Sequence, residues 1–94
     1  MTAMAPWLYS HISTSATTAV KAGPGHLHAV VVNTKGTVAS TTTIYDNTAA
    51  SGTVVAVIDS LNQSGTFTYG LQCATGITVV TTGTAAPDVT VLYR

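Results

Sequence analysis

Charged side chains are scarce in this sequence. Of its 94 residues, three are lysine or arginine and three are aspartate, and there is no glutamate. An average soluble domain carries about a quarter charged residues, so this chain has roughly a fourth of the usual supply. Its net charge of zero leaves little electrostatic repulsion to keep copies apart. We therefore expect other protein to cover much of its surface in the working state, as in a component of an assembly.

Cysteine, basic stretches and long apolar runs are also scarce. Cys73 is the one cysteine, which excludes an intramolecular disulfide framework and indicates a small core residue. The basic residues Lys21, Lys35 and Arg94 are far apart, so no basic stripe indicates nucleic acid. Every apolar run is far shorter than the roughly 20 residues that span a membrane, and Met1 to Ile12 lacks the pattern of a secretory signal. We predict neither a nucleic-acid nor a membrane partner.

The sequence offers few groups for catalysis. General acid–base catalysis usually needs paired carboxylates or a histidine with a partner. Asp46, Asp59 and Asp88 are widely spaced, and each lies next to a predicted strand end, where aspartate commonly forms turns. No G-x-S-x-G motif, phosphate loop or cysteine pair is present. The sequence predicts a protein that is not an enzyme and has no cofactor.

His26 and His28 are the sharpest local signal. Residues two apart on a strand point to the same face, so these two imidazoles could approach one metal ion, and His11 is the remaining imidazole. A metal site normally adds a further nitrogen, sulfur or carboxylate ligand, and none lies at a recognisable spacing. We predict no metal site. We predict instead that the strand bearing His26 and His28 contacts another subunit.

Threonine and valine are abundant, and the pattern of apolar residues has a period of two almost throughout. These β-branched side chains suit a pleated sheet and crowd a helix. Seven short strands are predicted between turn residues: Thr17 to Lys21, His26 to Asn33, Ser40 to Tyr45, Thr53 to Asp59, Gly65 to Gln72, Gly76 to Thr82 and Asp88 to Arg94. Such spacing is typical of a β-sandwich or small barrel. We predict one all-β domain at residues 15–94, a β-sandwich or small barrel of about seven short antiparallel strands.

The alternation also predicts which side chains face the core. Phe67, Tyr69 and Leu71 are expected to point inward, and Leu27, Ala29 and Val31 are expected to share one face of their strand. The predicted strand at Thr53 to Asp59 has apolar residues on both faces. It is therefore expected to be covered on two sides.

Residues 1–14 differ in composition and are predicted to form an N-terminal arm. Its aromatic cluster is Trp7, Leu8 and Tyr9, and the polar run Ser10 to Ser15 follows. Two interpretations are open: Trp7 caps the core of the sandwich, or the cluster docks on a partner. An edge strand that pairs with a neighbouring subunit would also protect a sheet edge without charge. We take Trp7, Leu8 and Tyr9 as the predicted partner-facing residues.

Four short segments carry a resemblance to a known family. They are Thr43-Ile44-Tyr45-Asp46-Asn47, Ser51-Gly52-Thr53, Gly76-Ile77-Thr78-Val79-Val80 and Asp88-Val89-Thr90-Val91. With them, the stretch from Ala19 to Arg94 resembles the capsid decoration, or cement, proteins of tailed bacteriophages. The resemblance implies a β-sandwich or jelly-roll-like unit, usually a homotrimer, on the outside of an icosahedral shell. Such a unit would straddle joints between major capsid proteins, resist the pressure of packaged DNA and carry no catalytic residues.

Two functions are therefore considered. The first is a structural virion protein, made in the host cytoplasm, that binds the capsid exterior through Trp7, Leu8 and Tyr9 and clamps neighbouring major capsid proteins. The second is a head- or tail-fibre module that recognises host-surface glycans, which the tyrosines and the His26/His28 face suggest. Uncharged Thr, Ser and Asn side chains favour burial against protein, because they lose less hydration than Lys or Glu. We expect the first function.

Overall fold

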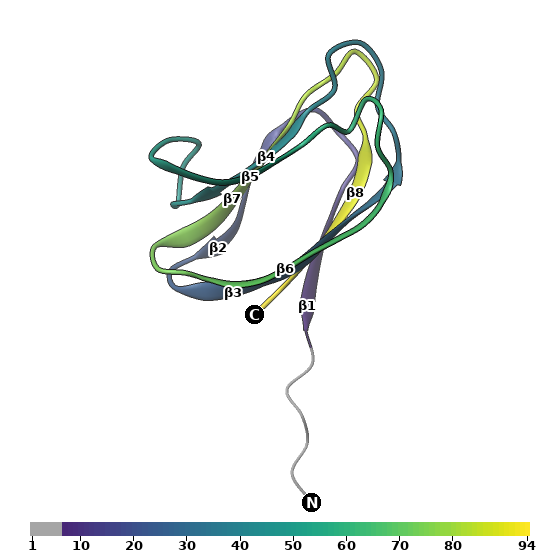
Figure 1. The fold of residues 1–94 in the computed structure, drawn as a ribbon. Coiled ribbons are helices and arrows are strands. Elements are labelled where there is room, and N and C mark those ends of the chain that lie inside the picture. Colours follow the sequence, from purple (N-terminus) through teal and green to yellow (C-terminus); the bar gives the residue numbers. More distant parts are fainter. Residues whose placement is uncertain (1–6) are drawn as a thin grey trace, which may run out of the picture.

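The computed structural model describes residues 7–94, and these residues form eight β-strands (Figure 1). The strands are β1 (Leu8–Ile12), β2 (Thr17–Ala22), β3 (Gly25–Thr34), β4 (Thr42–Asp46), β5 (Thr53–Ile58), β6 (Gly65–Cys73), β7 (Gly76–Thr81) and β8 (Asp88–Tyr93). The all-β prediction is confirmed. The seven predicted strands correspond to β2 through β8, with ends that agree to within two residues.

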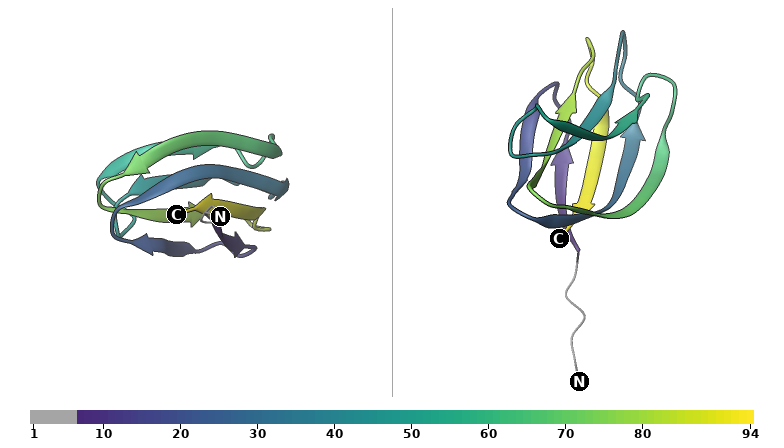
Figure 2. Two further views of the ribbon diagram at one scale, coloured as in Figure 1. Left: turned by 90° about the horizontal axis from the view of Figure 1, so that it is seen from below. Right: turned by 60° about the vertical axis from the view of Figure 1, so that its left-hand side comes forward.

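Two four-stranded antiparallel sheets pack face to face as a sandwich (Figure 2). The first sheet has the strand order β1-β8-β3-β6, and the second has the order β2-β7-β4-β5. Strands of the first sheet run the length of the sandwich, since β3 and β8 pair from Leu27 opposite Tyr93 to Thr34 opposite Asp88. The start of β1 and the C-terminus lie at one end, and the loops 35–41 and 82–87 lie at the other (Figures 1 and 2). We call the latter, together with the loop 59–64, the loop end.

The eighth strand comes from the segment that was predicted to be an arm. Leu8–Ile12 forms β1, which pairs with β8 at the edge of the first sheet, from Leu8 opposite Tyr93 to Ile12 opposite Val89. Ile12 is buried in the core. The count of seven strands was therefore one too low. The polar segment Ser10 to Ser15 has too few apolar residues for the sequence to show that its first three residues belong to a β-strand.

The core lies between the two sheets. Its fully buried side chains come from both of them: Leu27, Val30, Val32, Ile44, Ile77, Val79, Val89 and Val91. Phe67, Tyr69 and Leu71 of β6 pack against this cluster, which confirms that they point inward. Cys73 is also buried in the core, and this burial is the main reason that the pKa of its thiol is raised.

The prediction that Leu27, Ala29 and Val31 share one face of β3 is wrong. The register of β3 against both of its neighbours shifts between Leu27 and Ala29. Such an irregularity reverses the alternation of side chains that follows it. As a result Val30 and Val32 point into the core, whereas Val31 is half-buried. Ala29 is buried but does not belong to the core cluster.

Strand β5 is not covered on two sides, contrary to its sequence pattern. It lies at the edge of the second sheet and pairs only with β4. Val54 and Val57 are 47% and 63% exposed. The register against β4 also shifts so that Tyr45 lies opposite Val54 and Ile44 opposite Ala56. The apolar pattern of β5 therefore leaves an uncharged, partly apolar edge open to contact with other protein.

Asp46 ties the end of β4 to the turn between β6 and β7. Its carboxylate accepts hydrogen bonds from the backbone N–H groups of Thr75 (2.8 Å), Ala74 (3.0 Å) and Gly76 (3.3 Å). The bonds from Thr75 and Ala74 hold the pKa of Asp46 below its ordinary value of 3.8, against a smaller raising effect of desolvation. One ionised group thus accepts hydrogen bonds from three successive backbone amides.

This arrangement predicts a stability that falls in acid. Because the pKa of Asp46 is lower in the folded chain, its contribution is present above the unfolded pKa and is lost as pH falls through the folded pKa. We expect the urea midpoint to fall between about pH 5 and pH 2, and to fall less steeply in Asp46→Asn. Asp59 and Asp88 also have lowered pKa values, so part of the dependence should remain. An equal acid dependence in Asp46→Asn and the native chain would contradict the role given to this carboxylate.

Candidate protein interface

Large apolar side chains are exposed where β1 begins and β8 ends. Trp7, Leu8 and Tyr9 are 41%, 50% and 70% exposed. The antiparallel pairing of β1 with β8 sets Leu8 opposite Tyr93 and Tyr9 opposite Leu92. Since β1 is an edge strand, its aromatic residues are accessible from the side as well as from the end of the sandwich.

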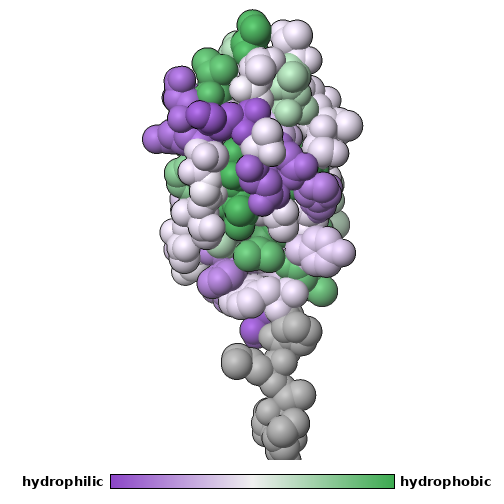
Figure 3. Space-filling model, turned by 90° about the vertical axis from the view of Figure 1, so that its right-hand side faces the viewer, coloured by the Kyte–Doolittle hydropathy of each residue, from purple (hydrophilic) through white to green (hydrophobic). Residues whose placement is uncertain are grey.

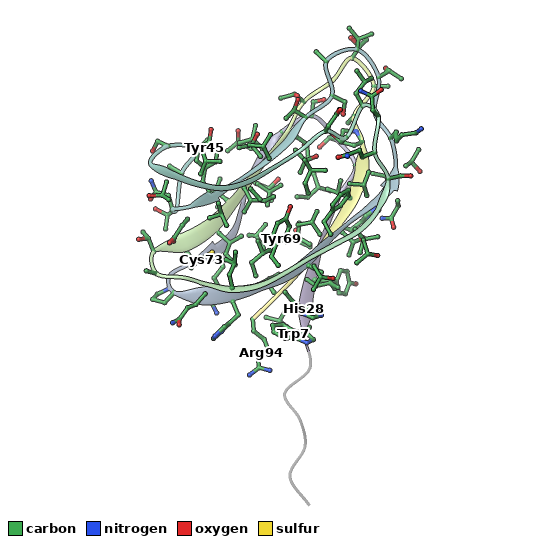
Figure 4. The ribbon with its side chains drawn as sticks, in the orientation of Figure 1. Trp7, His28, Tyr45, Tyr69, Cys73 and Arg94 are labelled. Carbon is green, nitrogen blue, oxygen red and sulfur yellow. The ribbon has the colours of Figure 1, made fainter. Side chains whose placement is uncertain are left out.

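The Trp7 ring has two close neighbours from distant parts of the sequence (Figure 4). The imidazole of His28 stacks on it, with ring centroids 4.5 Å apart and planes 9° from parallel. The guanidinium carbon of Arg94 lies over the Trp7 ring, 5.0 Å from its centroid, which is within cation–π range. Arg94 is held there by two backbone hydrogen bonds between it and His26, of 2.7 and 2.9 Å. We call Trp7, Leu8, Tyr9, His28 and Arg94 the aromatic end.

The structure brings together residues that the sequence assigned to two interfaces. Trp7, Leu8 and Tyr9 were predicted to face the capsid, and His26 and His28 another subunit. His28 instead stacks on Trp7, while His26 is exposed next to Arg94. Both sets therefore lie at one end of the sandwich, and the partner that each set contacts remains a prediction. Within residues 7–94, no three His, Cys, Asp or Glu side chains gather as a metal site would require.

Sequence reasoning missed Arg94 as a member of this site. The signal that could have indicated it is a single cation directly after the last strand, in a chain with only three basic residues. Arginine and tryptophan are among the residue types enriched in the few positions that carry most of the binding energy of protein interfaces. The contact between Trp7 and Arg94 places one residue of each type side by side on a protein with few charged side chains.

A polar cluster on β1, β3 and β8 was also missed. Asp88 Oδ1 lies 2.7 Å from His11 Nε2 and accepts a hydrogen bond of 3.0 Å from Asn33, whose amide also reaches the hydroxyl of Thr90 at 3.1 Å. The hydrogen bonds from Asn33 and then His11 lower the pKa of Asp88. All three contacts join residues that are 55 or more positions apart in the sequence, so only the fold reveals this cluster. Figure 3 shows hydrophobic residues interspersed with polar ones on the face that lies to the right in Figure 1.

Comparison of the chain with protein-family models, with curated proteins and with solved structures finds no match. Among residues 7–94 there is no helix with the length and apolar character needed to span a membrane. The described residues also enclose no pocket. The features available for binding are therefore surface features: the aromatic end, the open edge of β5, and the exposed Val38 and Leu61 of the loop end.

Proposed function

We propose that this chain is a structural virion protein that binds the outer surface of a tailed-phage capsid and clamps neighbouring major capsid proteins. The sequence resemblance to decoration proteins motivates the proposal. The exposed aromatic end is the single structural observation that carries it. Trp7, Leu8 and Tyr9 are large, apolar and accessible, and truncation of tryptophan or tyrosine at interfaces commonly causes the greatest loss of affinity.

The remaining surface suits a protein that works while covered by others. With six charged side chains in the chain, docking requires little removal of water from ionised groups. Short Thr and Ser side chains also lose less conformational freedom on docking than Lys or Glu. A clamp of this kind acts through total contact area over many copies and needs no reactive group.

Self-association as a homotrimer belongs to the same proposal. The strand bearing His26 and His28 was chosen from the sequence as the subunit contact. His26 is exposed and available, whereas His28 is half-buried and stacked on Trp7. The open β5 edge, with Val54 and Val57 exposed, offers a second strip that a neighbouring copy could cover.

The test is binding to undecorated capsids. Purified protein mixed with shells that lack decoration should bind saturably, reach hundreds of copies per particle, and raise the melting temperature of the shell. The melting temperature must rise because a protein that binds only the folded shell stabilises it relative to the unfolded shell. Shells that bind no protein at any concentration would eliminate the proposed function.

One observation favours the glycan-binding alternative. Tyr9 and His11 are two residues apart on β1, so the exposed Tyr9 ring lies on the same strand face as the His11–Asp88–Asn33 cluster. An exposed aromatic ring beside planar hydrogen-bonding groups could stack against and orient a sugar. This alternative predicts hits on a glycan array and only a few to a few dozen copies per virion, so copy number separates it from shell decoration.

A further inference from the structure

The tip of the loop between β3 and β4 has a strained backbone. Val38 and Ala39 have positive φ values of 45° and 59°. For a β-branched residue this region is an outlier, because the side chain crowds the backbone. Two successive positive φ values are the pattern of a type I′ turn, in which Asn-Gly is the preferred pair. Local folding therefore does not explain why valine and alanine occupy these positions.

The neighbouring loop 82–87 holds the tip in this conformation. Thr37 N donates to the carbonyl of Ala85 (2.9 Å), and Thr84 N donates to the carbonyl of Thr37 (3.0 Å). The hydroxyl of Thr82 donates to the carbonyl of Ala39 (3.1 Å). These bonds fix the backbone on both sides of Val38.

Buried hydroxyl groups anchor the same loop from below. The hydroxyls of Ser40 and Ser60 lie 2.8 Å apart, and that of Thr42 donates to Ser60 Oγ at 3.2 Å; all three residues are buried. Gly36 N donates to the carbonyl of Ser60 at 2.9 Å. A Cβ on Gly36 would lie 2.8 Å from the carbonyl oxygen of Ala85, so the loops are too close for any larger residue. A strained backbone such as that of Val38 and Ala39 persists when the surrounding hydrogen bonds and packing allow no other conformation.

The strained side chain is not used inside the chain. Val38 is 66% exposed, so burial in this fold does not compensate for its backbone conformation. Leu61, in the adjacent loop of the same end, is also exposed. Lys35 and Asp59 are the only charged residues in the three loops. The loop end thus presents a rigid, nearly uncharged surface with an apolar tip.

We propose that Val38 is a preformed contact that inserts into an apolar recess of a shell protein, as the second contact point of the clamp. The inference rests on the proposed function, in which one chain must hold two neighbouring shell subunits. The aromatic end and the loop end lie at opposite ends of the sandwich (Figures 1 and 2), as bridging two subunits requires. A loop that is already rigid loses little freedom on docking, which favours affinity.

Two glycine variants separate the side chain from the strain. Val38→Gly and Ala39→Gly each place glycine at a position of positive φ, but the first removes the large exposed isopropyl group of Val38, whereas the second removes a single methyl. Both should raise the melting temperature of the isolated protein, by about 5 °C. Binding to undecorated shells, measured by co-sedimentation, should weaken about tenfold for Val38→Gly and stay unchanged for Ala39→Gly.

Each other outcome overturns the inference. If Val38→Gly binds shells as tightly as the native chain, Val38 is not a contact. If Ala39→Gly weakens binding as much as Val38→Gly, the turn conformation matters and the Val38 side chain does not. If neither variant gains thermal stability, the tip is not strained. These results leave the proposed function intact, whereas a native chain that does not bind shells overturns both.

Discussion

Replacing Ile44 with alanine is expected to lower the free energy of unfolding by about 2–5 kcal/mol. Ile44 is fully buried in β4, which lies between β7 and β5. It is paired with Val79 on one side and Ala56 on the other. Because hydrogen-bonded strands hold both neighbours, they cannot collapse into the space that the lost side chain leaves. In a domain whose total stability is about 5–15 kcal/mol, this is a large loss.

The measurement is urea unfolding of the isolated chain, with Val57→Ala as the control. Val57 lies on the adjacent strand β5 and is exposed, so its truncation should change the free energy of unfolding by no more than about 0.5 kcal/mol. At a protein concentration where the chain is monomeric, equal losses from the two substitutions would show that Val57 is buried within the chain. That result would contradict the exposed edge described for β5.

Replacing Trp7 with alanine is expected to weaken binding to undecorated capsids about 30-fold, which corresponds to roughly 2 kcal/mol. Trp7 is partly exposed, and its ring contacts His28 and Arg94. Its removal therefore takes away a large contact surface and releases two side chains that it positions. Trp7 precedes the first residue of β1, so the sandwich should fold as before.

Trp7→Phe is the matched control for this prediction. Phenylalanine keeps a flat ring that can stack on His28 and face Arg94, so we expect it to retain most of the binding. Co-sedimentation gives the affinities, and the urea midpoint of each variant shows whether the isolated protein remains folded. Full shell occupancy by a folded Trp7→Ala protein would remove the aromatic end from the capsid interface.

Much of the fold could be predicted from the sequence because strand formation here is encoded locally. The alternation of Thr and Val predicts the seven strands β2 to β8, and Gly, Pro and Asp mark the turns between them. Strand β1 escaped prediction because its place depends on pairing with β8, at the far end of the chain. Likewise, Leu27, Ala29 and Val31 do not share one face of β3 as predicted, since one register shift reverses the alternation of side chains and no residue type marks its position.

The candidate site was only half predictable for a similar reason. Trp7, Leu8 and Tyr9 stand out in a sequence with few aromatic residues. Their contacts with His28 and Arg94 join positions more than 20 and more than 80 residues away, and no spacing rule encodes them. The strain at Val38 could not be foreseen either, because it depends on hydrogen bonds from the loop 82–87.

The lengthwise course of the strands has a mechanical consequence. β1, β3 and β8 run between the aromatic end and the loop end, and hydrogen bonds between antiparallel strands are perpendicular to the strand axis. A pull applied between the two ends therefore shears these bonds, and all of them resist together. Tension applied perpendicular to the strands would instead break the hydrogen bonds one after another. A swelling shell that stretched the protein from end to end would load it along its strongest direction.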